Sequence, residues 1–240
     1  MLFRSYSFAI SFAQLKHITN PPVTAIEKNN SYIVNGILTY VTGYKIFNTL
    51  VIAFACGDKE MFAITPFCES ESLSIVETLN LVTANSSNTV ACKLVNHVID
   101  KSMVIIENNL GTFMNNNPKR LRNLVGFSAG LAAATLNLIS EHPSLEIAKV
   151  RDTYDWLIQH LLQLENALLQ LPNTLSVVPL RVKMINLLNK IFLFAEQLVK
   201  SQGTLDNHPL AIIRKESIII TASASSVDTL IETCELLSSS

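Results

Sequence analysis

β-Strand patterns fill the first half of the chain. Short runs of β-branched and aromatic residues alternate there with turn residues. Residues 32–41 contain Asn35-Gly36 at their centre and predict a β-hairpin, because Asn-Gly suits a two-residue turn in which both residues have positive φ. The polar segment 57–60 lies between two apolar runs and predicts a second hairpin. Further strands are expected at 74–83, 89–99 and 102–106. This spacing favours a small antiparallel β-barrel or sandwich.

Helical periodicity fills the second half. The tract 115–118 (Asn-Asn-Asn-Pro) marks the change, so we expect a β domain over 1–115 and a helical domain over 116–240. Apolar residues recur there at three- and four-residue spacing in segments of about 118–140, 145–171, 179–203 and 209 to the C-terminus. Long helices with short connections predict a four-helix up-and-down bundle, so the expected fold class is α+β.

One stretch of the helical half is unusually apolar. Residues 123–140 contain no charged side chain, and Gly126 and Gly130 form a GxxxG pair. The stretch has only the minimum length of a transmembrane helix, and Asn, Ser and Thr residues interrupt it. We therefore expect a buried helix that packs closely through its small residues, and a membrane span is the weaker alternative.

Composition and charge narrow the class of protein. Among 240 residues, 18 Lys and Arg face 19 Asp and Glu, for a formal net charge of -1. That balance argues against a nucleic-acid groove, which needs clustered basic residues. The four cysteines, Cys56, Cys68, Cys92 and Cys234, lack metal-type spacing. We expect buried, reduced thiols and a cytoplasmic protein.

Catalytic and metal-binding motifs give no positive signal. The five histidines are scattered, and none has another three or four residues away, so no metal site is predicted. The chain has no phosphate-binding Gly-rich loop and no GxSxG nucleophile motif. Motifs alone therefore predict no catalytic residue.

Several segments together resemble one enzyme family. Residues 32–43 (YIVNGILTYVTG) resemble the middle-domain signature of acyl-CoA dehydrogenases, in which a hairpin leads into a strand along the flavin. Residues 51–55 and 62–66 resemble the two strands that follow, and residues 126–132 resemble the first helix of that family's C-terminal bundle. Lys215 matches a lysine of its last helix. The resemblance covers nearly the whole chain, in the same order.

The resemblance implies an FAD-dependent oxidoreductase that acts on the CH-CH group of an acyl thioester. It carries flavin contacts over to Tyr40, Thr42 and Gly43, with the Thr42 hydroxyl near the flavin N5 and Tyr40 packed on the ring. Ser11 stands for the threonine of the family's flavin and pyrophosphate stretch, which residues 10–15 otherwise replace.

Departures from the family leave the activity open. The chain begins almost at the middle domain, without the N-terminal helical domain, and it ends before the segment that usually carries the catalytic glutamate. Basic residues near Arg120 occupy the alternative glutamate position, so no catalytic base can be named. One candidate is a truncated, divergent acyl-CoA dehydrogenase-like flavoprotein completed by a separate chain. The others are a non-catalytic assembly or binding module without flavin, and a helical bundle unrelated to the family.

The resemblance also implies a homo-oligomer that associates through the bundle. The last two expected helices carry apolar faces that would fit such an interface, and a closed bundle core explains them equally well. These residues are Leu187, Leu188, Phe192, Phe194, Leu198, Val227, Leu230 and Ile231.

Overall fold

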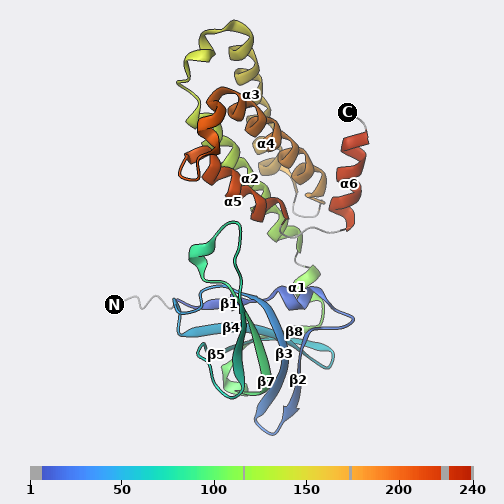
Figure 1. Ribbon diagram of the computed structural model, residues 1–240. Coiled ribbons are helices and arrows are strands. Elements are labelled where there is room, and N and C mark those ends of the chain that lie inside the picture. Colours follow the sequence, from blue (N-terminus) through green and yellow to red (C-terminus); the bar gives the residue numbers. More distant parts are fainter. Residues whose placement is uncertain (1–6, 116, 173–174, 223–226, 239–240) are drawn as a thin grey trace, which may run out of the picture. The chain divides into compact units, whose positions relative to one another are not determined.

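The computed structural model describes residues 7–115, 117–172, 175–222 and 227–238. The chain divides into two compact units, Met1–Asn116 and Asn117–Ser240. Figure 1 shows strands β1–β8 in the first unit, coloured blue to green, and helices α2–α6 in the second, coloured green to red. The expected α+β class, a mostly antiparallel sheet followed by helices, is confirmed.

The first unit is built on one eight-stranded sheet. Its strands are β1 (Ala9–Ser11), β2 (Val23–Lys28), β3 (Ser31–Val41), β4 (Thr49–Cys56), β5 (Lys59–Pro66), β6 (Leu73–Thr78), β7 (Val90–Asp100) and β8 (Val104–Asn109), followed by the short helix α1 (Thr112–Asn115). Their order is β6-β7-β3-β2-β4-β5-β8, and β1 pairs with β4. Pairing is antiparallel except where β4 meets β1 and β2. The central strand β4 is buried from Leu50 to Ala55, as its continuous apolar run requires.

The second predicted hairpin is confirmed. Strands β4 and β5 pair as far as Cys56 and Lys59, so the turn is the two-residue segment Gly57-Asp58, with Gly57 at φ 60°. Glu60, which the sequence placed in a polar turn, instead belongs to β5 and is fully buried.

The first predicted hairpin is wrong. Asn35-Gly36 is not a turn but lies inside the continuous strand β3, which pairs with β2 on one side and β7 on the other. The hairpin turn falls earlier, at Asn29-Asn30 between β2 and β3, where Asn29 has φ 54°. Asn tolerates this left-handed conformation better than other residues that carry a Cβ.

Asn35 and Gly36 lie at an irregularity in the sheet. The pairing of β3 with β7 shifts register here, and Asn96 of β7 donates its N–H to Asn35 Oδ1 at 2.7 Å. Gly36 has φ 141°, and a Cβ on it would lie 2.1 Å from the Pro22 carbonyl oxygen. The same oxygen accepts the Ile37 N–H at 3.2 Å. Gly36 thus permits a close approach of two backbone segments.

The second unit consists of helices. They are α2 (Asn117–Leu138), α3 (Ala148–Gln170), α4 (Val178–Val199), α5 (Pro209–Ala222) and α6 (Val227–Ser238). Periodicity therefore predicted the first three correctly. The expected fourth helix corresponds to α5 and α6, and residues 223–226 between them lie outside the described part of the chain. The core of the unit contains Leu187, Leu188 and Phe192 of α4, so these three side chains fill the bundle rather than an outer face.

The apolar helix α2 packs differently from expectation. Gly126 and Gly130 are exposed, and a Cβ on either would meet nothing within 4 Å. Val125, Ala129 and Ala132 are buried instead, so α2 does pack through small residues, but these are alanines and not the glycine pair. Within the described ranges, no helix combines the length and apolarity needed to cross a bilayer.

The cysteines are all free, but not all are buried. Cys92 is buried, and its burial raises the pKa of its thiol to about 12. Cys56 is half-buried, whereas Cys68 and Cys234 are exposed. The expectation of four buried thiols is therefore wrong for Cys68 and Cys234. Cys68 is followed by the polar run 69–72 and lies outside the strands.

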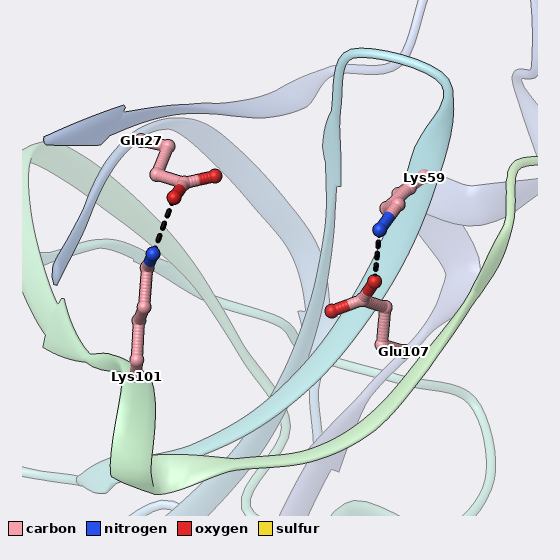
Figure 2. Close-up of polar contacts among 4 residues, drawn as sticks. All are labelled: Glu27, Lys59, Lys101 and Glu107. Carbon is pink, nitrogen blue, oxygen red and sulfur yellow. Dashed lines mark hydrogen bonds and ion pairs between the residues drawn. The ribbon is translucent and has the colours of Figure 1, made fainter. Parts of the chain in front are cut away.

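Two exposed ion pairs link strands of the first unit (Figure 2). Lys59 of β5 pairs with Glu107 of β8, and Lys101, in the β7–β8 connection, pairs with Glu27 of β2. The hydrogen bond from Lys101 lowers the pKa of Glu27, and the same contact raises the pKa of Lys101. Solvent screens such pairs, so we expect them to contribute little to stability.

Candidate functional site

The candidate site begins at the C-terminal end of β3. Register shifts between Leu38 and Val41, which pair with Cys92 and Val90, so β3 carries one extra residue. This bulge leaves Thr39 and Tyr40 both exposed, although strict alternation would bury one of them. The exposed fraction of Tyr40 is 56%. The aromatic side chain is therefore available to a ligand.

A tight turn follows the strand. Gly43 has φ 98°, and its carbonyl oxygen accepts the N–H groups of Ile46 and Phe47 at 3.1 and 3.0 Å. A Cβ on Gly43 would lie 2.4 Å from the Phe47 ring, so glycine is needed for both its conformation and its size. The turn fixes the backbone directly after Thr42.

Three hydroxyl groups meet beside this turn. Thr42 Oγ1 lies 3.4 Å from Thr89 Oγ1, which lies 2.8 Å from Ser87 Oγ. Gly43 donates its N–H to the Ser87 carbonyl at 2.8 Å. Sequence reasoning missed Ser87 and Thr89, because only strand pairing brings them beside Thr42. Thr42 as a whole is an exposed residue, although its hydroxyl lies against the buried Thr89.

Ser11 lies on a neighbouring strand but is used differently. Strand β1 reaches the site through a bridge between Ile10 and Thr42. Ser11 itself is buried, and its hydroxyl donates to Gln14 Oε1 at 3.3 Å. Gln14 Nε2 donates in turn to the carbonyl oxygens of Ser11 and Ala53, each at 2.7 Å. The Ser11 hydroxyl thus takes part in an internal network, whereas Tyr40 and Thr42 are exposed residues.

The bundle residues singled out in the sequence add no base. Lys215 of α5 donates to Asp206 Oδ1 at 2.9 Å, in an exposed ion pair. The side chains of Arg120 and Val227 lie outside the described part of the structure. Among the described residues, no group of three or more His, Cys, Asp or Glu side chains is arranged to hold a metal ion.

A polar network elsewhere in the first unit joins β7, β5 and the residue before β6. His97 of β7 is buried, with Nε2 2.8 Å from Thr65 Oγ1 and Nδ1 2.9 Å from Ser72 Oγ. Both hydroxyls can donate or accept, so a neutral imidazole satisfies both contacts. Burial lowers the pKa of His97.

This pKa predicts a pH-dependent stability. Below the unfolded-state pKa of about 6.5 the unfolded chain binds a proton that folded His97 resists. The free energy of unfolding should therefore decrease as the pH is lowered from about 7 to about 5. Most carboxylates titrate below this range. Urea unfolding of the wild type and of His97→Gln measures this. A wild-type slope that persists undiminished in His97→Gln would contradict the assignment to His97.

Comparison with known proteins finds similarity in structure only. No protein-family model and no curated protein sequence matches the chain. An acyl-CoA dehydrogenase from Geobacillus kaustophilus matches with a TM-score of 0.74 and 11% identity, over 97% of this chain and 69% of that chain. The butyryl-CoA dehydrogenase from Megasphaera elsdenii matches with a TM-score of 0.75 and 12% identity, over 97% and 68%.

A structure described as an FAD-dependent dehydrogenase also matches, with a TM-score of 0.76 and 15% identity, over 97% of this chain and 70% of that chain. At these identities the likeness concerns the fold. It extends over both units, so a fold that consists of a helical bundle alone is excluded. The chain therefore has an acyl-CoA dehydrogenase-like fold, corresponding to the middle and C-terminal domains of that family.

Proposed function

We propose that the chain is a divergent acyl-CoA dehydrogenase-like flavoprotein that takes part in oxidation of the CH-CH group of an acyl thioester. The observation that carries the proposal is the end of β3, where Tyr40 and Thr42 are exposed side by side with a glycine turn. The fold supports it, because solved structures of the same fold include an FAD-dependent dehydrogenase. Fold alone is a weak warrant for function, so the site residues must be tested directly.

The exposed residues fit one side of a flavin ring. Tyr40 offers an aromatic face for a planar ring, and Thr42 offers a hydroxyl that can donate to a ring nitrogen. Thr89, 3.4 Å away, can accept or donate and so restrict the rotation of the Thr42 hydroxyl. A flavin bound here would accept the hydride of the reaction. Ser11 does not fit a role toward the cofactor, because its hydroxyl is buried and bonded to Gln14.

The acyl thioester reaction also needs a base for the α-proton. Since basic residues near Arg120 occupy a position where the resemblance places a glutamate, we propose that a second chain supplies the base. Self-association through α6 would complement this, because Leu230 and Ile231 are 64% and 53% exposed. Light scattering of the purified chain reports the number of subunits. A monomer at all concentrations would contradict self-association.

One observation favours the second candidate, a non-catalytic module without flavin. The side chain that would stand for the family's flavin and pyrophosphate contact is Ser11, and it is only 2% exposed. A chain that has lost this contact can keep the fold as an assembly or binding module. Flavin binding separates the two candidates, whatever the activity.

We expect substitutions at the end of β3 to weaken flavin binding. Tyr40→Ala should raise the dissociation constant about tenfold and Thr42→Val about three- to tenfold, since one stacked ring or one hydrogen bond contributes about 1 kcal/mol. Quenching of flavin fluorescence during titration measures both.

Thr39→Val is the matched control, because Thr39 is an exposed threonine of β3, three residues before Thr42. Its dissociation constant should equal that of the wild type. Equal effects of Thr39→Val and Thr42→Val, or wild-type binding that neither Tyr40→Ala nor Thr42→Val weakens, would place the flavin elsewhere and overturn the assigned site.

A further inference from the structure

A groove between α3 and α4 of the helical unit has the composition of a small-molecule site. Its volume is about 310 Å³, at the lower end of the range for ligand pockets. One wall comes from α3 and the other from α4, and both belong to the same unit. The lining residues are Trp156, His160, Gln163, Leu164, Lys183, Asn186, Leu187 and Lys190.

The α3 wall presents stacked aromatic rings. The rings of Trp156 and His160 lie 3.9 Å apart between centroids, with planes tilted by 35°. His160 Nδ1 lies 2.8 Å from the Trp156 carbonyl oxygen and must donate to it, which leaves Nε2 as the free ring nitrogen. Trp156 is 41% exposed, a high value for a residue that usually anchors a core or a contact.

The α4 wall is positively charged. Lys183, Asn186 and Lys190 are spaced by three and four residues, so they share one face of the helix. The Lys190 ammonium lies 5.7 Å from the centroid of the Trp156 ring, which places a cation at the aromatic wall. None of the eight lining residues is acidic, so the groove carries the charge of two lysines without an internal counter-ion.

The floor and the remaining polar groups complete the site. Leu187 is buried and Leu164 is half-buried, which gives an apolar surface for the face of a planar ring. The amides of Gln163 and Asn186 can each donate and accept hydrogen bonds, as the edge of a heteroaromatic ring requires. The two lysines match a phosphate.

We propose that this groove binds a phosphorylated heteroaromatic ring of the size of a nucleoside monophosphate. The ring lies on the leucine floor beside Trp156, its edge meets the amides, and the phosphate lies between Lys183 and Lys190. The site is separate from the residues at the end of β3, so the inference does not depend on flavin binding.

The intrinsic fluorescence of the full chain tests this directly, because Trp156 is its one tryptophan. With excitation at the red edge of the indole band, where adenine does not absorb, AMP should change the emission saturably. Adenosine and inorganic phosphate should each bind at least about tenfold more weakly, since each lacks one half of the recognised chemistry.

Exposed lysines provide the variants and the control. Lys183→Gln and Lys190→Gln should each weaken AMP binding about tenfold, the loss expected for one charge-assisted hydrogen bond. Lys149→Gln, on α3 and outside the groove, should bind AMP as the wild type does. Circular dichroism confirms that all three are folded.

Three results would overturn the proposal. The first is the absence of a saturable response to AMP in the wild type. The second is equal AMP binding by Lys183→Gln, Lys190→Gln and Lys149→Gln, which would indicate a site elsewhere. The third is an emission change that follows protein concentration without AMP, which would assign the groove to contact between copies of the chain.

Discussion

Replacing Gly36 with alanine should destabilise the first unit more than the same substitution at any of its other glycines. The new Cβ would lie 2.1 Å from the Pro22 carbonyl oxygen and 2.7 Å from the Val23 Cα, both backbone atoms that cannot rotate away. The φ of 141° adds conformational strain for any residue with a Cβ. Overpacking and backbone strain together predict a loss of about 3–5 kcal/mol in the free energy of unfolding.

Gly57→Ala is the matched control for this prediction. Gly57 also has positive φ, at 60°, but a Cβ there meets nothing within 4 Å. Its cost should be only the left-handed penalty of about 1–2 kcal/mol. Urea unfolding followed by circular dichroism compares the two variants. A Gly36→Ala chain as stable as Gly57→Ala would contradict the close approach of β3 to the Pro22 backbone.

Replacing Glu60 with alanine should have the second largest effect. Glu60 is fully buried, and its two carboxylate oxygens accept the Gly111 N–H at 3.1 Å and the Phe113 N–H at 2.7 Å. Asn108 Nδ2 lies 3.5 Å from the carboxylate and adds a long third contact. The carboxylate thus ties the segment around α1 to β5.

Removing it takes away the acceptor of the buried Gly111 N–H and of the half-buried Phe113 N–H, and an unsatisfied buried donor costs about 1–3 kcal/mol. We expect Glu60→Ala to lower the free energy of unfolding by about 3–5 kcal/mol. Glu60→Gln should cost less, because it keeps one acceptor oxygen. Faster amide exchange at Gly111 and Phe113 than in the wild type should accompany both changes.

Glu107→Gln is the control for Glu60, since Glu107 lies on β8 beside β5 and its side chain is 44% exposed (Figure 2). Its ion pair with Lys59 is screened by water, so stability should hardly change. Similar losses in Glu60→Ala and Glu107→Gln would contradict the role of burial in the Glu60 contacts.

The fold could be predicted where pattern and local chemistry agree. The hairpin at Gly57-Asp58 and helices α2, α3 and α4 follow from alternation and from helical period. The Asn35-Gly36 prediction failed because Asn and Gly are favoured both in tight turns and at register shifts within a sheet. The close approach of the Pro22 backbone requires Gly36 here, and the residues around position 36 do not reveal that contact.

Burial of polar and small residues was harder to predict. Glu60 belongs to a polar segment of the sequence, yet its carboxylate is buried because it accepts the backbone N–H groups of Gly111 and Phe113. Gly126 and Gly130 have the spacing of a packing motif, but the apolar residues beside them set the buried face of α2. Such outcomes depend on partners distant in sequence, and single-sequence periodicity does not contain them.

The candidate site could be predicted in part. Tyr40, Thr42 and Gly43 were identified from the resemblance, and they lie together at one strand end. Ser11 lies on the adjacent strand, but its hydroxyl is turned to Gln14. Ser87 and Thr89 carry no motif, so their contact with Thr42 depends on the pairing of β3 with β7.

The visible absorbance spectrum of the purified chain, incubated with FAD and then desalted, tests the central claim most directly. The proposal that Tyr40 and Thr42 lie along a flavin predicts flavin bands that remain with the protein at about one flavin per chain. Tyr40→Ala should retain less under the same conditions. A wild-type spectrum without flavin bands, alone or with candidate partner chains, would contradict the flavoprotein proposal and favour the non-catalytic module.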